Sequence, residues 1–258
     1  MNDLINGNCI DVMANMDPES IDLTVTSPPY DQLRDYKGFT FDFEGVANQL
    51  FRVTKKGGVV VWVVGDSVIK GSESLTSFKQ ALYFKEIGFN VHDTMIYHKT
   101  NSSLPDPTRY FQCFEYMFVF SKGKPKTVNL IIDRKNNTGG SFRDHRSLRN
   151  KEGEMEFRPN SKKVPEFSRR QNVWTITPGY MHTTKDKYAF QHPAMFPESL
   201  AQDHIKTWSN EGDLILDPFC GSGTTCKMAK LLSRNYIGID ISEEYLEIAK
   251  RRVAQNVI

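Results

Sequence analysis

Hydrophobic and polar positions along this chain predict strands and helices that follow one another. Residues 21–26 are β-branched and alternate in polarity, and Ser27-Pro28-Pro29 ends the run, so a strand is predicted there. Residues 43–55 carry apolar side chains at helical spacing, and Gly57-Gly58 is predicted to end that helix. The continuous apolar run 59–64 predicts a strand that is buried on both faces.

The same alternation continues through most of the chain. Further strands are predicted at 3–7, 89–98, 114–120, 213–217 and 235–240, and further helices at 9–16, 73–87, 195–209, 224–233 and 243–255. Between Ser121 and about Pro178 the periodicity fades, and Gly, Asn, Ser, Arg and Lys dominate. The pattern therefore predicts an α/β fold with residues 1–121 and 179–258 in one sheet domain and residues 122–178 as an insert.

Composition narrows the class of protein. The 258 residues are 39% hydrophobic, 25% charged and 12% aromatic, which is typical of a folded globular chain. No apolar run approaches the roughly 18 residues that span a bilayer. The start, Met1-Asn2-Asp3, lacks the basic and apolar regions of a signal peptide. We therefore expect a cytoplasmic protein with no membrane contact.

The cysteines indicate neither a metal site nor a disulfide framework. Cys9, Cys113, Cys220 and Cys226 include no Cys-x-x-Cys pair, which disfavours a zinc ribbon or a thioredoxin-like site. We expect four reduced and mostly buried thiols and no bound metal.

The net charge of +2 hides a strong asymmetry. Residues 122–170 hold fourteen Lys and Arg against six Asp and Glu, a net charge of +8, and the remainder holds nineteen against twenty-five, a net charge of −6. A basic segment within an otherwise acidic chain indicates a polyanionic partner, with nucleic acid first among the candidates.

A glycine-rich turn follows the predicted strand 213–217. That strand ends at Asp217, and Gly221-Ser222-Gly223 then opens the helix that begins near Thr224. Glycines allow a ligand to approach the backbone closely, and the free N–H groups of a helix start point toward it. The next strand ends at Asp240, about twenty residues after the glycines, where a carboxylate is placed to bind ribose hydroxyls. The pattern fits a nucleoside cofactor.

Two other phosphate-binding motifs do not match this turn. The P-loop is excluded because Gly-Lys-Ser/Thr is absent. The dinucleotide pattern G-x-G-x-x-G is incomplete because Cys226 stands where its third glycine would be.

A second motif, Ser27-Pro28-Pro29-Tyr30, follows the predicted strand 21–26. Its two prolines stiffen the chain and remove two N–H donors. The carbonyls of Ser27 and Pro28 and the Ser27 hydroxyl then act as acceptors, and Tyr30 supplies a flat face. Acceptors beside an aromatic ring suit a planar group that carries an NH₂.

Together these motifs resemble those of the SAM-dependent DNA amino-methyltransferases, which modify adenine N6 or cytosine N4. The family's catalytic motif (D/N/S)-P-P-(Y/F/W) is matched by residues 27–30, and its cofactor motif D-P-F-x-G-S-G-T-T is matched by residues 217–225. The family's H-P-x-x-x-P-x-x-L is matched by residues 192–200. The order of catalytic motif, insert and cofactor motif is that of the circularly permuted β group, and the resemblance covers residues 1–121 and 179–258.

The resemblance implies a Rossmann-like, seven-stranded and mostly parallel sheet with one antiparallel strand, and helices on both faces. It implies S-adenosyl-L-methionine (SAM) as cofactor and residues 122–178 as the target-recognition region. The implied cofactor-binding residues are Asn8, Cys9, Pro197, Ser199, Asp217, Pro218, Phe219, Gly221, Ser222, Gly223, Thr224, Thr225 and Asp240. The chain departs from the family at Gly7-Asn8-Cys9, where the family often has Gly-Asp-x and the acid contacts the adenine of the cofactor. Asn8 can hydrogen-bond the edge of this adenine, and Asp11 is a candidate to replace the missing acid.

The implied chemistry is direct methyl transfer to an exocyclic amine. Such an amine is a poor nucleophile because its lone pair is delocalised into the ring. Hydrogen bonds to Ser27 and to the Pro28 carbonyl favour a tetrahedral nitrogen that attacks the methyl group in line, and they stabilise its developing positive charge. Cytosine-C5 chemistry is disfavoured because no cysteine follows a proline.

The implied partner is double-stranded DNA. The target base must be flipped out of the duplex, and Tyr30 is expected to stack on it. The basic insert is expected to contact phosphates or guanines. The candidate residues are Arg143, Arg146, Arg149, Lys162, Lys163, Arg169 and Arg170.

The target base and some wider alternatives stay open. The family usually has Ser at the first motif position for cytosine N4 and Asp or Asn for adenine N6, so Ser27 favours cytosine N4, with adenine N6 as the alternative. Less favoured are an RNA or protein methyltransferase and a catalytically silent DNA-binding protein. The resemblance alone suggests a homodimer, and it does not separate a solitary enzyme from the partner of a restriction enzyme.

Overall fold

The computed structural model describes residues 2–29, 41–100, 107–142, 145–159, 162–192 and 194–255. The chain forms two compact units. The sheet unit comprises Met1–Asn129 and Asn172–Ile258, and the insert unit comprises Leu130–Gln171. Within the described ranges, no helix has the length and apolar character needed to cross a membrane.

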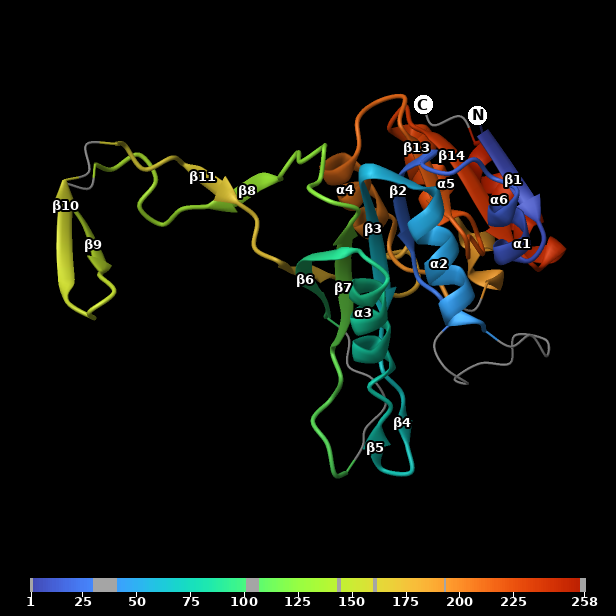
Figure 1. Cartoon of the computed structure of the whole chain (residues 1–258), viewed down its shortest axis with the longest axis horizontal. Helices are drawn as coiled ribbons and strands as arrows, with labels where there is room; N and C mark the ends of the chain where they lie inside the picture. The colour runs from blue at the N-terminus through green and yellow to red at the C-terminus, as the bar shows by residue number, and fades with distance from the viewer. Residues whose placement is uncertain are drawn as a thin grey trace. The chain divides into compact units, whose positions relative to one another are not determined.

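The sheet unit is built on one eight-stranded sheet of order β1-β14-β13-β2-β3-β7-β6-β12 (Figure 1). The strands are β1 (Asn2–Asn6), β2 (Ile21–Thr26), β3 (Thr54–Val64), β6 (Asn90–Lys99), β7 (Phe114–Ser121), β12 (Val173–Ile176), β13 (Leu214–Asp217) and β14 (Asn235–Asp240). Strand β7 is antiparallel to both of its neighbours, and every other neighbouring pair is parallel. The prediction of a mostly parallel α/β sheet with one antiparallel strand is confirmed.

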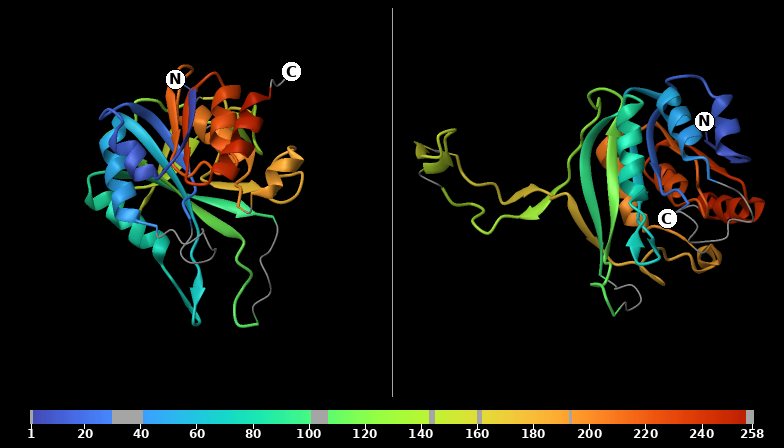
Figure 2. Two further views of the ribbon diagram at one scale, coloured as in Figure 1. Left: turned by 90° about the vertical axis from the view of Figure 1, so that its right-hand side faces the viewer. Right: turned by 60° about the horizontal axis from the view of Figure 1, so that its bottom comes forward.

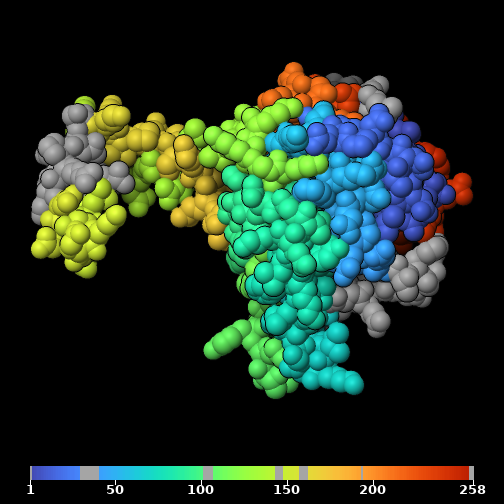
Figure 3. Space-filling model, in the orientation of Figure 1, coloured from blue at the N-terminus to red at the C-terminus, as the bar shows by residue number. Residues whose placement is uncertain are grey.

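Helices cover both faces of this sheet (Figure 2). Helices α1 (Cys9–Ala14), α2 (Phe43–Val53) and α3 (Thr76–Glu86) pack on one face, and α4 (Glu198–Trp208), α5 (Thr224–Leu231) and α6 (Glu243–Ala254) pack on the other. Because side chains alternate along a strand, Trp62 faces the first layer, whereas Val61 and Val63 face the second. Helices α1 and α2 also lie side by side at the surface (Figure 3).

The sheet has one strand more than predicted because β12 joins its edge. Val173–Ile176 pairs in parallel with β6, and Trp174 is buried against the α4 side. Four residues inside a polar segment give little periodic signal, which is why the sequence pattern did not predict this strand.

The passage from α2 to β3 differs from the prediction that Gly57-Gly58 ends the helix. Helix α2 ends at Val53 and β3 begins at once at Thr54, so both glycines lie inside the strand. Gly57 has φ +78°, and a Cβ there would lie 2.8 Å from the Lys126 Cβ. Its N–H donates to the Lys122 carbonyl over 2.7 Å. Gly57 therefore lets the segment after β7 approach the strand.

The insert unit is smaller than the predicted insert 122–178. Residues 122–129 and 172–178 belong to the sheet unit. Lys122 donates to the carbonyls of Phe51 and Thr54, and Lys126 donates to Asp22 over 3.1 Å. Residues 130–171 hold eleven Lys and Arg against six Asp and Glu, a net charge of +5. Part of the basic character of the predicted insert thus lies in the sheet unit.

The insert unit itself consists of two short antiparallel pairs. Strand β8 (Ile132–Lys135) pairs with β11 (Phe167–Arg169), and β9 (His145–Arg149) pairs with β10 (Met155–Pro159). A single bridge joins Phe142 and Lys163. The described side chains of this unit are exposed or half-buried, so backbone pairing contributes more to its structure than an apolar core does.

A buried carboxylate anchors one end of the sheet. Asp22 of β2 is 6% exposed and accepts from Lys55 Nζ over 2.6 Å and from the backbone N–H of Leu214 over 3.0 Å. Lys126 is its third donor. Burial alone would raise the pKa of Asp22, but the bonds from Lys55, Leu214 and Lys126 outweigh it and hold this pKa below its ordinary value.

Replacing this carboxylate destabilises the sheet unit. We expect Asp22→Asn to lower the free energy of unfolding by about 1–3 kcal/mol at pH 7, because two ammonium groups lose their anion. A group whose pKa is lowered in the folded state stabilises the fold fully at every pH above its unfolded pKa. This stabilisation is lost only as the pH falls through the folded-state pKa. The deficit should therefore be unchanged at pH 5. Urea unfolding at both pH values measures it.

The matched control for this substitution is Asp17→Asn, which alters an exposed aspartate in the turn before β2. Its unfolding curve should coincide with that of the unmodified chain. An Asp22→Asn variant that behaves like this control, or whose deficit disappears at pH 5, would contradict the anchoring role of Asp22.

Candidate functional site

The two predicted motifs follow adjacent parallel strands. Strands β2 and β13 are hydrogen-bonded neighbours, with Leu23 opposite Ile215. At their ends, Thr26 Oγ1 donates to Asp217 Oδ1 over 2.7 Å, and Thr225 Oγ1 donates to the Val25 carbonyl over 2.9 Å. The turn 218–223 and residues 27–29 therefore start from the same edge of the sheet, where open α/β sheets bind ligands.

The glycine turn adopts the conformation for which glycine is suited. Gly221 has φ +47° and Gly223 has φ +79°. A Cβ on Gly221 would lie 2.6 Å from His192 Nε2, and one on Gly223 would lie 2.7 Å from the Ala249 Cβ. The positive φ angles thus favour glycine at these two positions, and a Cβ at either one would force its close neighbour to shift.

The side chains of the turn face inward. Ser222, Thr224 and Thr225 are each at most 5% exposed. Ser222 Oγ and Thr224 Oγ1 each accept from Arg252 Nη1 over 3.0 Å. Their hydroxyls are thus used within the fold, so contacts of these three residues to a ligand must come mainly from their backbone groups.

Asp240 lies against the same turn, as its position at the end of β14 predicted. Its Oδ2 accepts from the Gly221 N–H and its Oδ1 accepts from the Ser242 N–H, each over 2.8 Å. Burial raises the pKa of Asp240 in spite of these hydrogen bonds. Each carboxylate oxygen has a second lone pair, so Asp240 can still accept from a hydroxyl of a ligand.

Asp217 is the most deeply buried acid of the site. It is 1% exposed and accepts from Thr26 and from the Phe219 N–H over 3.2 Å. Burial raises its pKa to about 6, although these hydrogen bonds oppose the shift. The carboxylate therefore fixes the turn from inside, and its charge is costly near neutral pH.

The Ser-Pro-Pro-Tyr motif is described only in part. Ser27 and Pro29 are half-buried and Pro28 is buried. Tyr30 lies outside the described residues, so its predicted stacking role has no structural account. The described part places Ser27 directly after the Thr26 that binds Asp217.

The predicted residues near the N-terminus take structural positions. Asn8 caps helix α1, and its Oδ1 accepts from the Ile10 N–H over 2.9 Å. Cys9 is buried, and burial raises the pKa of its thiol to about 12. Gly7 donates to the Asp240 carbonyl over 3.1 Å, which brings this segment to the site. The Oδ1 atom of Asn8 has a second lone pair and its NH₂ group can donate, so a contact between Asn8 and the adenine of the cofactor stays a prediction.

The segment before α4 reaches the glycine turn from the other side. Pro197 is buried at the start of α4, whereas Ser199 is exposed. His192 lies against Gly221, and its ring packs edge-on against Tyr245 at 4.4 Å between centroids. Glu198, between the two predicted residues, joins a buried ion-pair cluster with Arg252. Arg252 was not predicted as a site residue, because it stands in the ordinary basic run Lys250-Arg251-Arg252.

The predicted DNA-contacting residues fall into three groups. Arg149, Lys162, Lys163 and Arg169 are exposed in the insert unit. Arg170 is paired with Asp133, and this hydrogen bond holds the pKa of Asp133 below its ordinary value. Arg143 lies outside the described residues, and of Arg146 only the backbone is described, in β9.

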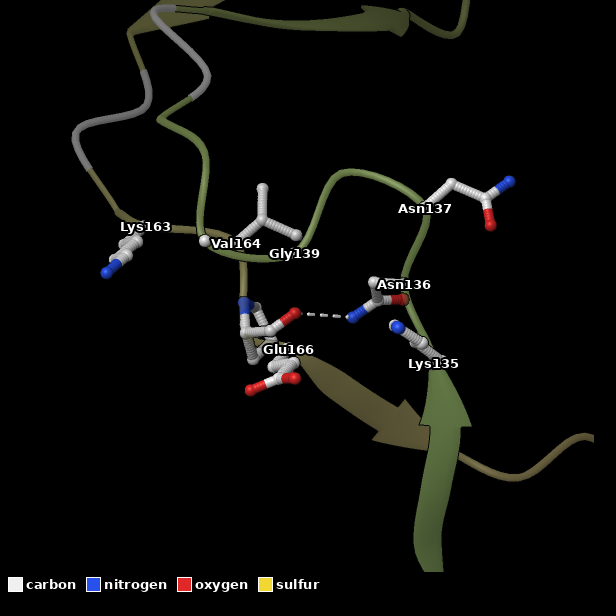
Figure 4. A pocket seen from close by; sticks show the side chains of 9 residues that line it. Lys135, Asn136, Asn137, Gly139, Lys163, Val164 and Glu166 are labelled. Atoms are coloured by element: carbon white, nitrogen blue, oxygen red, sulfur yellow. Dashed lines mark hydrogen bonds between the residues drawn. The ribbon is translucent and has the colours of Figure 1, made fainter.

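The insert unit also has a pocket of about 420 Å³ between residues 135–140 and 163–166 (Figure 4). Lys135 and Lys163 contribute to its lining together with Glu166. Asn136 Nδ2 donates to the Pro165 carbonyl over 2.8 Å and so holds the two sides together. In the described part of the chain, no group of three His, Cys, Asp or Glu side chains is arranged to hold a metal ion.

Comparison with known proteins shows the family to which this chain is similar. A family model described as DNA methylase, of the N6/N4 type, matches residues 21–251. The orphan methyltransferase M.BamHII of Bacillus amyloliquefaciens is 58% identical over 93% of this chain and 91% of its own length.

Solved structures agree on the fold. TTHA0409 of Thermus thermophilus, a proposed DNA modification methylase solved with S-adenosyl-L-methionine, is 25% identical with a TM-score of 0.65, over 98% of this chain and 93% of that one. The cytosine-N4-specific PvuII DNA methyltransferase is 20% identical with a TM-score of 0.70, over 100% of this chain and 88% of that one.

The buried charge of Asp217 should be visible in the pH dependence of stability. A folded-state pKa near 6 means that the folded chain binds a proton between about pH 6 and pH 4 that the unfolded chain does not. Relative to Asp217→Asn, the unmodified chain should therefore gain on the order of 1 kcal/mol of unfolding free energy when the pH falls from 7.5 to 5. Denaturant unfolding of both proteins at both pH values gives the difference.

Titrating groups that do not interact with Asp217 are shared by the two proteins and cancel in this comparison, and the charge of Asp240 adds to the rise in the pKa of Asp217. Asp22, whose pKa is lowered, stays ionised over the same range. A free-energy difference that is constant between pH 7.5 and pH 5 would show that Asp217 is not the titrating group.

Proposed function

This chain belongs to the family of N6- and N4-specific DNA methylases, and we propose that it transfers the methyl group to the N4 amino group of cytosine. It is a SAM-dependent DNA methyltransferase of the amino-methyltransferase class. The observation that supports methyl transfer at this site is the Thr26–Asp217 hydrogen bond, which joins the strand before Ser27 to the strand before the glycine turn.

We propose that the glycine turn and Asp240 hold the cofactor. The groups present fit it: two glycines at positive φ give close backbone approach, and the half-buried Asp240 carboxylate has lone pairs for ribose hydroxyls. Pro218, Phe219 and the segment at Pro197 and Ser199 complete the proposed set. When bound, SAM supplies an electrophilic methyl group on its sulfonium.

The proposed reaction uses acceptors rather than a covalent intermediate. The Ser27 hydroxyl and the Pro28 carbonyl accept the hydrogens of the target amine, orient its lone pair and stabilise the positive charge that develops on nitrogen. Pro29 keeps the backbone rigid, and Tyr30 is proposed to stack on the flipped base. Burial raises the pKa of Cys9, Cys220 and Cys226, so none of these three is a thiolate nucleophile near neutral pH.

The choice of cytosine rests on Ser27. In the family that this chain resembles, Ser at the first motif position goes with cytosine N4, and Asp or Asn goes with adenine N6. A hydroxyl acceptor at Ser27 satisfies one amine hydrogen without adding a charge next to the electrophile. Adenine N6 is the second candidate, because both amines need the same pair of acceptors.

The product identifies the base. The purified chain is incubated with methyl-labelled SAM and unmethylated duplex DNA, and the nucleosides are then analysed by mass spectrometry. We expect labelled N4-methylcytosine. Labelled N6-methyladenine would keep the class and the mechanism but overturn the cytosine assignment, and label in RNA but not in DNA would overturn the DNA assignment of the insert.

The role of the Ser27 hydroxyl is tested by Ser27→Ala. We expect kcat to fall on the order of 10²-fold, because one preorganised partner of the amine is lost, with the Kd for SAM unchanged. The control is Ser20→Ala, since Ser20 flanks the opposite end of β2 and its hydroxyl donates to the Asp17 carbonyl. Equal kcat values for the two variants would remove Ser27 from the proposed mechanism.

The exposed cations of the insert unit are proposed to contact DNA phosphates. Each phosphate contact contributes nearly one unit to the slope of log K against log salt. We therefore expect Lys163→Ala to weaken DNA binding and to reduce that slope by about one, as measured by fluorescence anisotropy between 50 and 200 mM salt (about the range in which such slopes are resolved). Lys250→Ala, which removes an exposed lysine paired with Glu247 in α6, is the control, and an equal slope for the two variants would contradict the contact.

A further inference from the structure

Arg252 of α6 is a charged side chain that lies entirely inside the sheet unit. It is 0% exposed, although its neighbours Lys250 and Arg251 are at the surface. Its Nη1 donates to the Ser222 carbonyl over 2.9 Å and to the hydroxyls of Ser222 and Thr224 over 3.0 Å each. Ser222 is the residue between the two glycines at positive φ. One half of the guanidinium therefore holds the glycine turn from within.

The other half of the guanidinium holds Asp186, in the segment that precedes α4, and Glu198, the first residue of α4. Nε donates to Asp186 Oδ2 over 3.0 Å, and Nη2 donates to Glu198 Oε1 over 2.6 Å. Lys227 of α5 donates to the same two carboxylate oxygens over 2.7 and 2.8 Å. Helices α5 and α6, which contact each other (Figure 1), thus meet the segment 186–198 through two cations and two anions.

The charges of this cluster balance. Burial would raise the pKa of Asp186, but the bonds from Lys227 and Arg252 outweigh it and hold this pKa below its ordinary value. Asp186 is therefore ionised at neutral pH. A buried network of this kind contributes less to stability than apolar packing of similar volume would, because desolvation costs about as much as the pairing gains. Its effect is instead to fix where its members lie.

A second contact links the same two elements. His192, in the segment before α4, lies so close to Gly221 that a Cβ there would meet its ring at 2.6 Å. The turn and the segment are therefore in contact at one end through His192 and are tied at the other end through Arg252. Any shift of one relative to the other changes the gap between Gly221 and the start of α4.

We propose that Arg252 is a positioning residue for the cofactor, because its planar guanidinium bonds the Ser222 carbonyl on one side and the Glu198 and Asp186 carboxylates on the other. It sets the glycine turn and the 186–198 segment at the spacing that SAM requires. This proposal rests on the proposed cofactor role of the turn. A lysine cannot replace Arg252, because one ammonium cannot reach both sets of acceptors in a fixed plane.

The test is Arg252→Lys, which keeps the positive charge but removes the planar guanidinium and its fixed N–H donors. We expect the Kd for SAM, measured by calorimetry on the folded chain, to rise at least tenfold. The KM for SAM should rise in parallel, while kcat at saturating SAM and the KM for duplex DNA stay within about threefold of the unmodified chain. This division separates positioning from general damage, since partial unfolding would lower the active fraction and leave the Kd of the folded molecules unchanged.

Arg234→Lys is the matched control. Arg234 also donates to backbone carbonyls, those of Leu232 and Ser209, but at the opposite ends of α4 and α5. Its variant should keep its Kd for SAM within twofold. If Arg252→Lys does not fold, Glu198→Gln removes the charge that Arg252 bonds on the α4 side, and a rise of several-fold in the Kd for SAM is expected.

The outcomes separate this inference from the function on which it rests. If the unmodified chain does not bind SAM, the proposed role of the glycine turn fails. If the unmodified chain binds SAM, and the folded Arg252→Lys or Glu198→Gln variant binds it with the same Kd, Arg252 is a structural residue and the inference is overturned.

Discussion

The hydrogen bond from Thr26 to Asp217 is the contact on which the arrangement of the site depends. It joins the last residues of two adjacent parallel strands, and each strand is followed directly by one of the two motifs. Asp217 also accepts from the Phe219 N–H, so the same carboxylate starts the turn that leads to Gly221. A shift of β2 against β13 by one residue would turn Thr26 away from Asp217. The register of these two strands therefore fixes the distance between the proposed acceptors of the amine and the proposed cofactor turn.

This contact has a cost that the rest of the sheet offsets. Thr24, Thr26 and Asp217 are buried polar residues of β2 and β13, and their neighbours Leu23, Val25, Ile215 and Leu216 are buried apolar residues. Burial raises the pKa of Asp217 to about 6, so the charge disfavours the folded state near neutral pH. Apolar layers on both faces of the sheet supply the opposing stability, with Trp62 and Phe84 in one layer and Ile205 in the other. Buried polar groups that lower the stability of a core and lie together at one edge of a sheet are typical of a functional site.

Much of this fold could be predicted from the sequence because local patterns and tertiary structure agree. The β-branched run before Ser27, the strand that ends at Asp217 and the one that ends at Asp240 all appear where polarity predicted them. The glycine turn was predictable because its positive φ angles and its close neighbours favour glycine. The passage at Gly57 was not, since its conformation is imposed by residues 122–126, which are far away in the sequence. Lys122 and Lys126 were assigned to a DNA-binding insert for the same reason: a lysine that bonds a buried carbonyl or carboxylate looks like any other in a basic segment.

The position of Arg252 on the buried side of α6 could have been recognised in the sequence, and it distinguishes Arg252 from its neighbours Lys250 and Arg251. The buried positions of α6 include Leu246, Ala249 and Val253, which define a stripe at helical spacing, and Arg252 falls on the same side. Lys250 instead pairs with Glu247 at the surface, and Arg251 lies over the ring of Tyr188. A charged residue within an apolar stripe requires buried partners of opposite charge, and these come from Asp186 and Glu198, which no local pattern connects to α6. The requirement could be read from the sequence, but the partners could not. Because an arginine that satisfies this requirement brings little stability, the benefit of keeping it lies in what it holds in place, which is the turn between Gly221 and Gly223.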